Sequence, residues 1–532
     1  MRRMSRNLAF GVAAAVAVPL CAPASPLAPD PVRSSALTLR IEQTAQAQPP
    51  EGRPPDFAAP VAIGGRLHIV DQARGRILRD DGRGDFSEIL SPEQMPDGVT
   101  PVRQRVLNIA GGAGSDMFVT FTSSTLPGDA LEAQHLPTDP EYGSQDPHYQ
   151  VVYRYSQADD GSLASPVPLA AFESTPFGHT GGGMLALPDG NLLLATGDNL
   201  GFDRDGLAAP QDPASHLGKL LLIDRDTGQT TVAAQGVRNV QRLAYANAGR
   251  SRVVFADIGS TTAEEINEIS VADLTDTGAI ENFGWGRNDD GKAREGTFYI
   301  NAGAGSPEGG EPQAIVAAPV PEAGFRQPYA QFGHEGRRFV AVSGPVTSDS
   351  AFDLIVALFG DLPSGELYAT MAPLGGTDVP VFRVALVDGS GAPVSLFALA
   401  EERRPDPRFF ALPDGTAGVM LERTGTLYRL TEIAPVPLPG AAGLLLSGGL
   451  ALGALRMAAR RRPSRAAQAT PASTGGGPPR AAPRRRDPRS GRELRGGQKR
   501  DVVGAQPRAR RQPREGHTVG QHFHHVGVVG DT

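Results

Sequence analysis

The chain has 532 residues, of which 40% are hydrophobic and only 6% aromatic, and it is rich in glycine (65) and proline (47). This composition favours a large, loop-rich β protein over a helical one. The formal net charge of -7 conceals an asymmetry, because 18 basic and 5 acidic residues lie from Arg456 onward, whereas 33 basic and 53 acidic residues precede it. An acidic body binds nucleic acid poorly, so we expect no nucleic-acid partner.

The first 24 residues have the three-part layout of a secretory signal. Three arginines within residues 2–6 precede an apolar run over residues 8–20, and the small residues 22–24 offer a cleavage site. We therefore expect residues 1–24 to direct export. Cys21 is the only cysteine and lies in this segment, so the exported chain would hold no disulfide, thiolate nucleophile or zinc–thiolate site.

The next segments predict a linker and then a long series of strands. Residues 25–56 are rich in Ala, Pro and Gln without an apolar period, which is typical of a linker. From residue 57 to residue 432, short strands recur with turn glycines between them. In residues 184–195, for example, Pro188-Asp189-Gly190 divides two apolar runs, as the turn of a β-hairpin would.

The recurring strands predict an all-β fold, and we favour a six-bladed β-propeller as its architecture. About 375 residues at roughly 40 to 65 residues per blade are enough for six blades. A pair of packed β-sandwiches is the alternative that strand spacing leaves open.

The chain beyond the strands carries a second targeting signal and a basic tail. Residues 433–462 contain Val436-Pro437-Leu438-Pro439, an uncharged apolar stretch over residues 440–455 and an arginine cluster. This segment resembles the PEP-CTERM type of bacterial sorting signal, which implies contact with the export and sorting machinery and a transient membrane anchor. The apolar stretch is shorter than the ~20 residues of a comfortable membrane span. Residues 463–532 lack an apolar pattern, so we expect them to be disordered. The expected location is the bacterial periplasm, cell envelope or extracellular matrix.

A lone histidine, His179, lies just before a triple glycine and the predicted hairpin. Such a residue can serve as a general base, although a turn or packing role is commoner. Further motifs follow it in order, namely SHLGKLLLID (215–224), GVRNVQRLAY (236–245), FADIGSTTAEEINEI (255–269) and ENFGWGRNDDG (281–291). In this order and spacing, residues 178–291 resemble the soluble quinoprotein glucose dehydrogenase and aldose sugar dehydrogenase family, also called glucose/sorbosone dehydrogenases.

The resemblance implies a six-bladed propeller that binds pyrroloquinoline quinone (PQQ) and calcium. It implies oxidation of an aldose or related sugar or polyol, with electrons passed to an external acceptor. His179 takes the position of the general base, and Arg238 that of a catalytic cation which stabilises charge on the quinone. The residues implied to contact the cofactor are Arg238, Asn239, Gln241 and Arg408.

The resemblance also implies sites for calcium, an ion that prefers oxygen ligands. Backbone carbonyls at the positions of Gly259 and Ser260 hold the ion of the active site in the family, where the second residue is usually proline. Glu265 matches an acidic position that holds a structural calcium. A solvated carboxylate on a loop is the alternative interpretation of Glu265.

The chain departs from the family at positions that bind the cofactor. Gly178 replaces the acidic residue of glucose-oxidising members, and Pro363 stands where a lysine is usual. Arg403, Arg404 and Arg408 lie upstream of a Pro-Asp-Gly turn at shifted spacing. Because PQQ carries three carboxylates, fewer basic partners would weaken its binding. The second hypothesis is therefore a non-catalytic propeller that acts as a binding module of the envelope or matrix. No Gly-x-Ser-x-Gly, cysteine or His-Glu-x-x-His site supports a hydrolase.

Overall fold

A computed structural model describes residues 32–35, 37–47, 55–97, 99–127, 148–174, 178–198, 208–246, 249–260, 262–276, 278–286, 293–300, 324–334, 340–347, 352–401 and 403–433. The predicted signal segment (1–24), almost all of the sorting segment (433–462) and the basic tail (463–532) lie outside these residues. Within the described ranges, no helix combines the length and the apolar character needed to cross a membrane.

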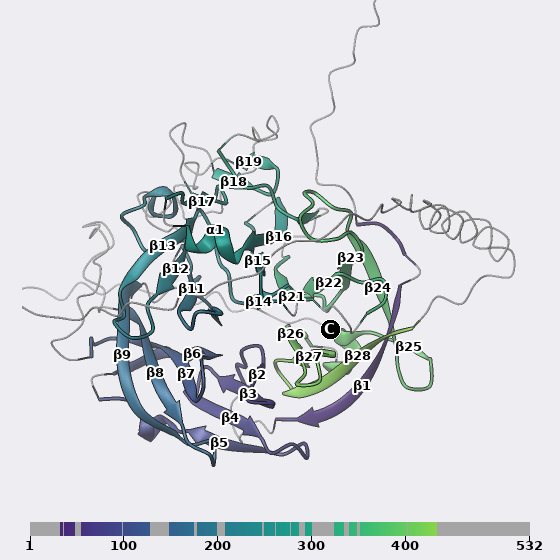
Figure 1. The fold of residues 1–532 in the computed structure, drawn as a ribbon. Coiled ribbons are helices and arrows are strands. Elements are labelled where there is room, and N and C mark those ends of the chain that lie inside the picture. The colour runs from purple at the N-terminus through teal and green to yellow at the C-terminus, as the bar shows by residue number, and fades with distance from the viewer. Residues whose placement is uncertain are drawn as a thin grey trace, which may run out of the picture. The chain divides into compact units, whose positions relative to one another are not determined.

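The described chain is almost entirely β structure, arranged in sheets of strands that neighbour one another in sequence (Figure 1). The first sheet contains, in order, β2 (Val61–Ile63), β3 (Arg66–Asp71), β4 (Arg76–Asp80) and β5 (Phe86–Leu90). The second contains β6 (Pro101–Gly111), β7 (Asp116–Ser123), β8 (His148–Gln157) and β9 (Leu163–Ser174). The third contains β10 (Gly181–Ala186), β11 (Leu192–Thr196), β12 (Lys219–Ile223), β13 (Thr230–Gln235) and β17 (Glu281–Asn282). The fourth contains β14 (Leu243–Tyr245), β15 (Arg252–Asp257), β16 (Ala263–Ser270) and β20 (Ala330–Gly333).

The C-terminal strands form one larger sheet together with the first strand of the chain. Its order is β21 (Val342–Thr347), β22 (Ala357–Asp361), β23 (Leu367–Thr370), β24 (Phe382–Val387), β1 (Thr38–Gln46), β28 (Thr426–Ile433), β27 (Ala417–Leu421) and β26 (Pro407–Ala411), with β25 (Pro393–Val394) beside β24. A small hairpin joins β18 (Ala293–Glu295) to β19 (Phe298–Ile300). Short helical turns occur at η1 (Pro92–Gln94), η3 (Ala209–Gln211), α1 (Val271–Thr275) and α2 (Leu396–Leu399).

The sheets follow one another around a ring. Their first strands contact one another in the cyclic order β2, β6, β10, β14, β21, β26 and back to β2. Hydrophobic clusters fill the spaces between neighbouring sheets, as with Phe118 and Leu221 between the second and third, and Ile69 and Met420 where the ring closes. The all-β prediction is confirmed, and the cyclic contacts give a propeller-like arrangement rather than two packed sandwiches. Among the described residues, strand pairing separates four sheets of four or five strands, one nine-stranded sheet and the two-stranded hairpin, so it does not by itself show six blades.

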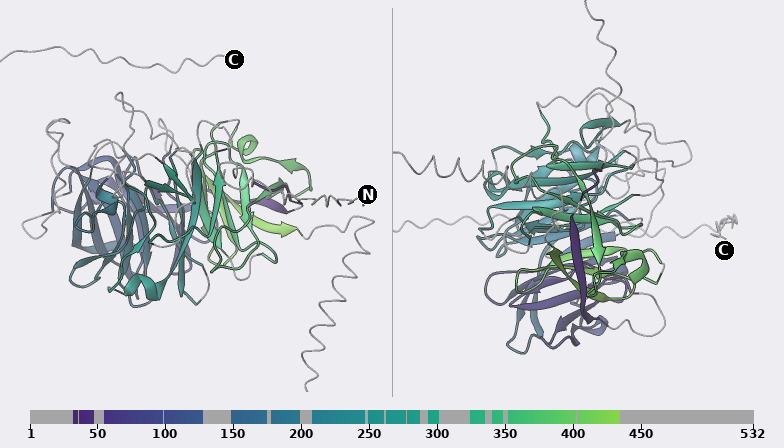
Figure 2. Two further views of the ribbon diagram at one scale, coloured as in Figure 1. Left: turned by 90° about the horizontal axis from the view of Figure 1, so that it is seen from above. Right: turned by 90° about the vertical axis from the view of Figure 1, so that its right-hand side faces the viewer.

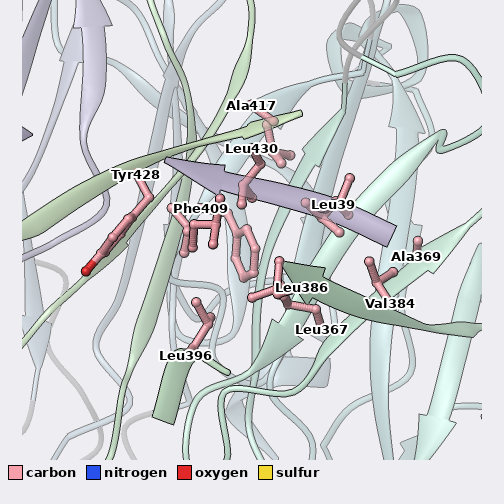
Figure 3. Close-up of a cluster of buried hydrophobic side chains, with 14 of the residues drawn as sticks. Leu39, Leu367, Ala369, Val384, Leu386, Leu396, Phe409, Ala417, Tyr428 and Leu430 are labelled. Atoms are coloured by element: carbon pink, nitrogen blue, oxygen red, sulfur yellow. The ribbon is translucent and has the colours of Figure 1, made fainter. Parts of the chain in front are cut away.

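The linker predicted for residues 25–56 is wrong where it includes β1. This strand runs antiparallel to β28, from Thr38 opposite Ile433 to Gln46 opposite Thr426, and parallel to β24. The purple strand lies beside the C-terminal strands in all views (Figures 1 and 2). Leu39 points into a hydrophobic cluster shared by β21–β24 and β26–β28 (Figure 3), and Ile41 belongs to the same cluster. The sequence hides this strand because its apolar positions are few and the polar residues between them face solvent.

Candidate functional site

A cavity of about 370 Å³ lies where the first strands of the sheets meet. Segments at or just before β2, β6, β10, β14, β21 and β26 all contribute to its wall. This volume lies in the range of small-molecule sites. Polar residues at this wall include His179, Asn239, Gln241, Arg242 and Arg408.

His179 stands at the cavity wall directly before the hairpin that the sequence predicted. The hairpin is confirmed: β10 and β11 pair antiparallel with Met184 opposite Leu194, and Gly190 turns with a φ of +93°. A Pro-Asp-Gly turn is a local signal, since proline presets φ and glycine accepts positive φ. Sequence alone therefore positioned the element that presents the histidine.

A buried carboxylate fixes the His179 ring. Nδ1 of His179 lies 2.9 Å from Oδ1 of Asp198, and Nε1 of Trp285 donates to Oδ2 of the same carboxylate at 2.8 Å. Burial alone would raise the pKa of Asp198, but the hydrogen bonds and charges of its neighbours outweigh burial and hold that pKa below its usual range. An ionised carboxylate only accepts hydrogen bonds, so the proton of neutral His179 resides on Nδ1 and Nε2 carries a lone pair.

The backbone at His179 is strained, and a glycine makes room for it. His179 has a φ of +50°, in the left-handed region that non-glycine residues rarely adopt. A Cβ placed on Gly197 would lie 1.6 Å from the carbonyl oxygen of His179. Glycine at position 197 therefore lets the histidine turn approach the end of β11.

The triple glycine serves close packing between protein segments. A Cβ on Gly181 would lie 2.7 Å from the carbonyl oxygen of Ala195, and one on Gly182 would lie 2.6 Å from the Leu107 side chain. Glycines in such a run can also let a backbone approach a flat ligand. The structure gives them protein neighbours instead, although Gly181 also lines the cavity.

The Arg238–Asn239 pair is anchored by a second buried carboxylate. The backbone N–H groups of Arg238 and Asn239 donate to Asp257 at 2.8 and 2.7 Å. Burial and the nearby Glu265 raise the pKa of Asp257 to about 8. The Arg238 guanidinium lies 5.1 Å from the centre of the Trp285 ring and donates to the carbonyls of Ile258 and Gly259. Asn239 lines the cavity, whereas Arg238 is not among the lining residues, so its catalytic and cofactor roles stay predictions.

The residues predicted to bind calcium are engaged by other protein groups. The Gly259 carbonyl accepts from Nη1 of Arg238 at 2.7 Å. At Ser260 the N–H donates to Glu295 at 2.8 Å, whereas the predicted ligand there is the carbonyl. Glu265 is buried and accepts from Asn267 at 2.8 Å and from Nη2 of Arg294 at 3.3 Å. Across the described residues, no group of three acidic, histidine or cysteine side chains could hold a metal ion. Guanidinium groups thus already donate to two of the three predicted calcium ligands, Gly259 and Glu265, and the calcium assignments stay predictions.

The Arg294–Glu265 pair leads to a prediction about stability. Arg294→Met is expected to lower the free energy of unfolding by about 3–5 kcal/mol, because it leaves the buried Glu265 carboxylate without its cation. Urea unfolding of the full chain measures the change. Arg429→Met is the control, since its ion pair with Asp414 is half-exposed and should matter by less than about 1 kcal/mol. EGTA should leave the unfolding midpoint of the wild-type protein unchanged. A clear fall with EGTA would show that an ion, rather than Arg294, stabilises this region.

Gln241 and Arg408, both implied as cofactor contacts, meet at the cavity wall. Nη1 of Arg408 donates to Oε1 of Gln241 at 3.1 Å, and its Nη2 forms an ion pair with Glu422. Burial would lower the pKa of Arg408, but Glu422 and other nearby carboxylates raise it. The structure thus brings His179, Asn239, Gln241 and Arg408 to one cavity.

Sequence reasoning missed Asp198, Trp285 and Arg242 as parts of the site. The sequence could have indicated Asp198 as a neighbour of His179. It lies two residues after β11, and the hairpin turn brings the end of β11 back to the start of β10. Trp285 lies in the ENFGWGRNDDG motif, which gave it no role; it is buried and its Nε1 donates to Asp198. Arg242 had no signal, since nothing in its local sequence shows that it lines a cavity.

Comparisons with known proteins identify similar folds only. The sequence matches no known family description, and no curated protein is significantly similar to it. The PQQ-bound aldose sugar dehydrogenase of Streptomyces coelicolor is 18% identical, with 74% of this chain and 98% of that chain covered and a TM-score of 0.47. A putative oxidoreductase (glucose dehydrogenase) of Thermus thermophilus is also 18% identical, with 74% and 99% covered and a TM-score of 0.45. An AA12-family carbohydrate-active enzyme of Trichoderma reesei is 12% identical, with 76% and 98% covered and a TM-score of 0.45. At these values the function has to be argued from the residues of the site.

Proposed function

We propose that this protein is a quinoprotein-type oxidoreductase that removes hydrogen from an aldose or a related sugar or polyol, with His179 as general base. The observation that carries the proposal is the chain of hydrogen bonds from Trp285 through Asp198 to His179 at the wall of a ligand-sized cavity. A histidine used only for packing does not need a buried carboxylate that fixes its tautomer. General bases commonly have this arrangement.

Each residue of the site has its own role in the proposed reaction. Nε2 of His179 accepts the proton of a substrate hydroxyl, while Asp198 holds the ring and stabilises the imidazolium that forms. Bound PQQ would supply the hydride acceptor. Asn239, Gln241 and Arg408 line the same cavity and offer amide and guanidinium groups to a cofactor that carries carboxylates and carbonyls. We assign calcium no role in these steps, because the Gly259 carbonyl and the Glu265 carboxylate already accept from guanidinium groups.

The proposal also covers the number of blades, the export of the protein and its small-molecule partners. We count the nine-stranded sheet as two blades joined by β1. Among the described residues, six first strands contact one another in a closed cycle, and six hydrophobic clusters separate the sheets. We also propose export to the periplasm, envelope or extracellular matrix, on the sequence of residues 1–24 and 433–462. A sugar would be the small-molecule partner, with an external acceptor for its electrons.

Trp285 provides the test, because it is the only tryptophan of the chain and its ring contacts both Asp198 and Arg238. Titration of the full chain with PQQ should quench its fluorescence saturably, and aldoses should then reduce a dye through the protein. His179→Ala should keep the quenching and lose the dye reduction by at least about 100-fold. Quenching with equal dye reduction in the variant would remove His179 from the mechanism.

The ion pair between Arg408 and Glu422 favours a second candidate, a propeller that binds without catalysis. Glu422 neutralises a cation that the cofactor would otherwise use, and Pro363 offers no charge in place of a lysine. In that case Trp285 fluorescence would not respond to PQQ at tens of micromolar. The protein would then be a binding module of the envelope or matrix.

A further inference from the structure

Arg242 is a cation at the cavity wall whose charge the described protein does not balance. It follows Asn239 and Gln241 in the segment that leads into β14, and like them it lines the cavity. Its Nε is buried without a hydrogen-bond partner, and its Nη1 reaches only the carbonyl of Pro60 at 3.4 Å. Within the described residues no carboxylate forms an ion pair with it.

Two other buried arginines, Arg408 and Arg294, have acidic partners. Arg408 pairs with Glu422, and Arg294 pairs with Glu265. Burial is the cause that acts on the pKa of Arg242 and lowers it to about 10, and the side chain remains charged at neutral pH. A partly buried guanidinium without a counter-charge is costly to the empty protein. That cost is recovered when an anion enters the cavity.

The backbone of Arg242 is held firmly enough to define a binding position. A Cβ on Gly183 would lie 3.1 Å from the Arg242 backbone, so β10 packs directly against this residue. Asn108 bridges the same two segments, because its side-chain amide donates to Gly182 at 2.9 Å and to Gln241 at 3.4 Å. The base His179 and the cation Arg242 thus lie on neighbouring, tightly packed segments.

We propose that Arg242 is the carboxylate-binding residue of this cavity. A planar guanidinium binds a carboxylate through two parallel hydrogen bonds, which neither the amides of Asn239 and Gln241 nor the neutralised Arg408 can match. The inference rests on the proposed function for the position of the ligand. Two kinds of carboxylate fit this position beside Arg242, one on the quinone cofactor and one on an acidic sugar substrate.

Calorimetry on the full chain tests the assignment with three probes: PQQ, D-glucuronate and its uncharged counterpart D-glucose. Arg242→Gln should raise the Kd of the carboxylate probe that Arg242 holds by about 10- to 100-fold and leave D-glucose unaffected. Arg242→Lys keeps the charge without the planar pair of donors, so its Kd for that carboxylate probe should lie between those of the wild type and of Arg242→Gln. Arg40→Gln, an exposed residue of β1 outside the cavity, is the control for an equal change of net charge.

The pattern of results separates this assignment from the proposed function. A loss confined to PQQ places the cofactor carboxylate on Arg242, and a loss confined to D-glucuronate places the substrate there. Arg242-dependent binding of D-glucuronate by a protein that does not bind PQQ would support the assignment and end the quinoprotein proposal. Unchanged PQQ and D-glucuronate affinities in Arg242→Gln would overturn the assignment and leave the quinoprotein proposal intact. A wild-type protein that binds neither carboxylate would overturn it as well.

Discussion

A chain that lacks residues 32–47 is expected to lose most of its folding free energy. β1 pairs along its length with β28 and also with β24, so its loss exposes the edges of two strands at once. Leu37, Leu39 and Ile41 of this segment are buried in the cluster between the last sheets. Replacement of a single such residue by alanine typically costs about 2–5 kcal/mol, whereas a whole domain has about 5–15 kcal/mol. Removal of the entire strand should therefore leave the ring barely stable.

Urea unfolding followed by circular dichroism measures this effect in graded steps. Leu39→Ala in the full chain should lower the free energy of unfolding by about 2–5 kcal/mol, since Leu39 is fully buried. Arg40→Ala on the same strand is exposed and should change it by no more than about 0.5 kcal/mol. A chain that lacks residues 32–47 and still unfolds at the wild-type urea concentration would show that β1 is dispensable.

The contrast between β1 and the hairpin of β10 and β11 shows what the sequence could and could not predict. The hairpin is local: apolar strands flank a Pro-Asp-Gly turn, so all the information lies within a few neighbouring residues. The partners of β1 lie near the far end of the chain, and only Leu39 and Ile41 signal a buried face. Pairing across such a separation leaves almost no trace in the local pattern, so the strand was mistaken for a linker.

The candidate site was likewise predictable only where it depends on local sequence and strand order. Asn239 and Gln241 precede one inner strand and His179 precedes another, so a propeller with the predicted strand order brings them to its axis. The direction of the Arg238 side chain was not predictable, because it depends on the carbonyls of Ile258 and Gly259 and on the face of Trp285. Glu265 was predicted to hold calcium, and in the structure it pairs with Arg294. The sequence could not predict this pair, because Arg294 lies in a separate hairpin.

Asp198→Asn is expected to lower kcat by about 1,000- to 10,000-fold in the assay of sugar-dependent dye reduction. The reason is the tautomer of His179 rather than loss of a contact. Nε1 of Trp285 can only donate, so the amide oxygen of asparagine faces Trp285 and its NH2 group faces His179. Nδ1 of His179 must then accept a hydrogen bond, and its proton moves to Nε2. A protonated Nε2 cannot take a proton from the substrate. Because the ligand contacts are unchanged, the PQQ-dependent quenching of Trp285 and KM should stay close to the wild-type values.

A second substitution separates this explanation from simple damage to the site. Trp285→Phe removes the donor that fixes the amide, so in the double variant Asp198→Asn/Trp285→Phe the amide can turn its oxygen toward Nδ1 of His179. The histidine then regains its productive tautomer, and kcat should rise at least tenfold above that of Asp198→Asn alone. Trp285→Phe by itself should lose much less activity, because Asp198 still accepts from His179. A double variant no more active than Asp198→Asn would mean that the negative charge of Asp198 matters and the tautomer does not.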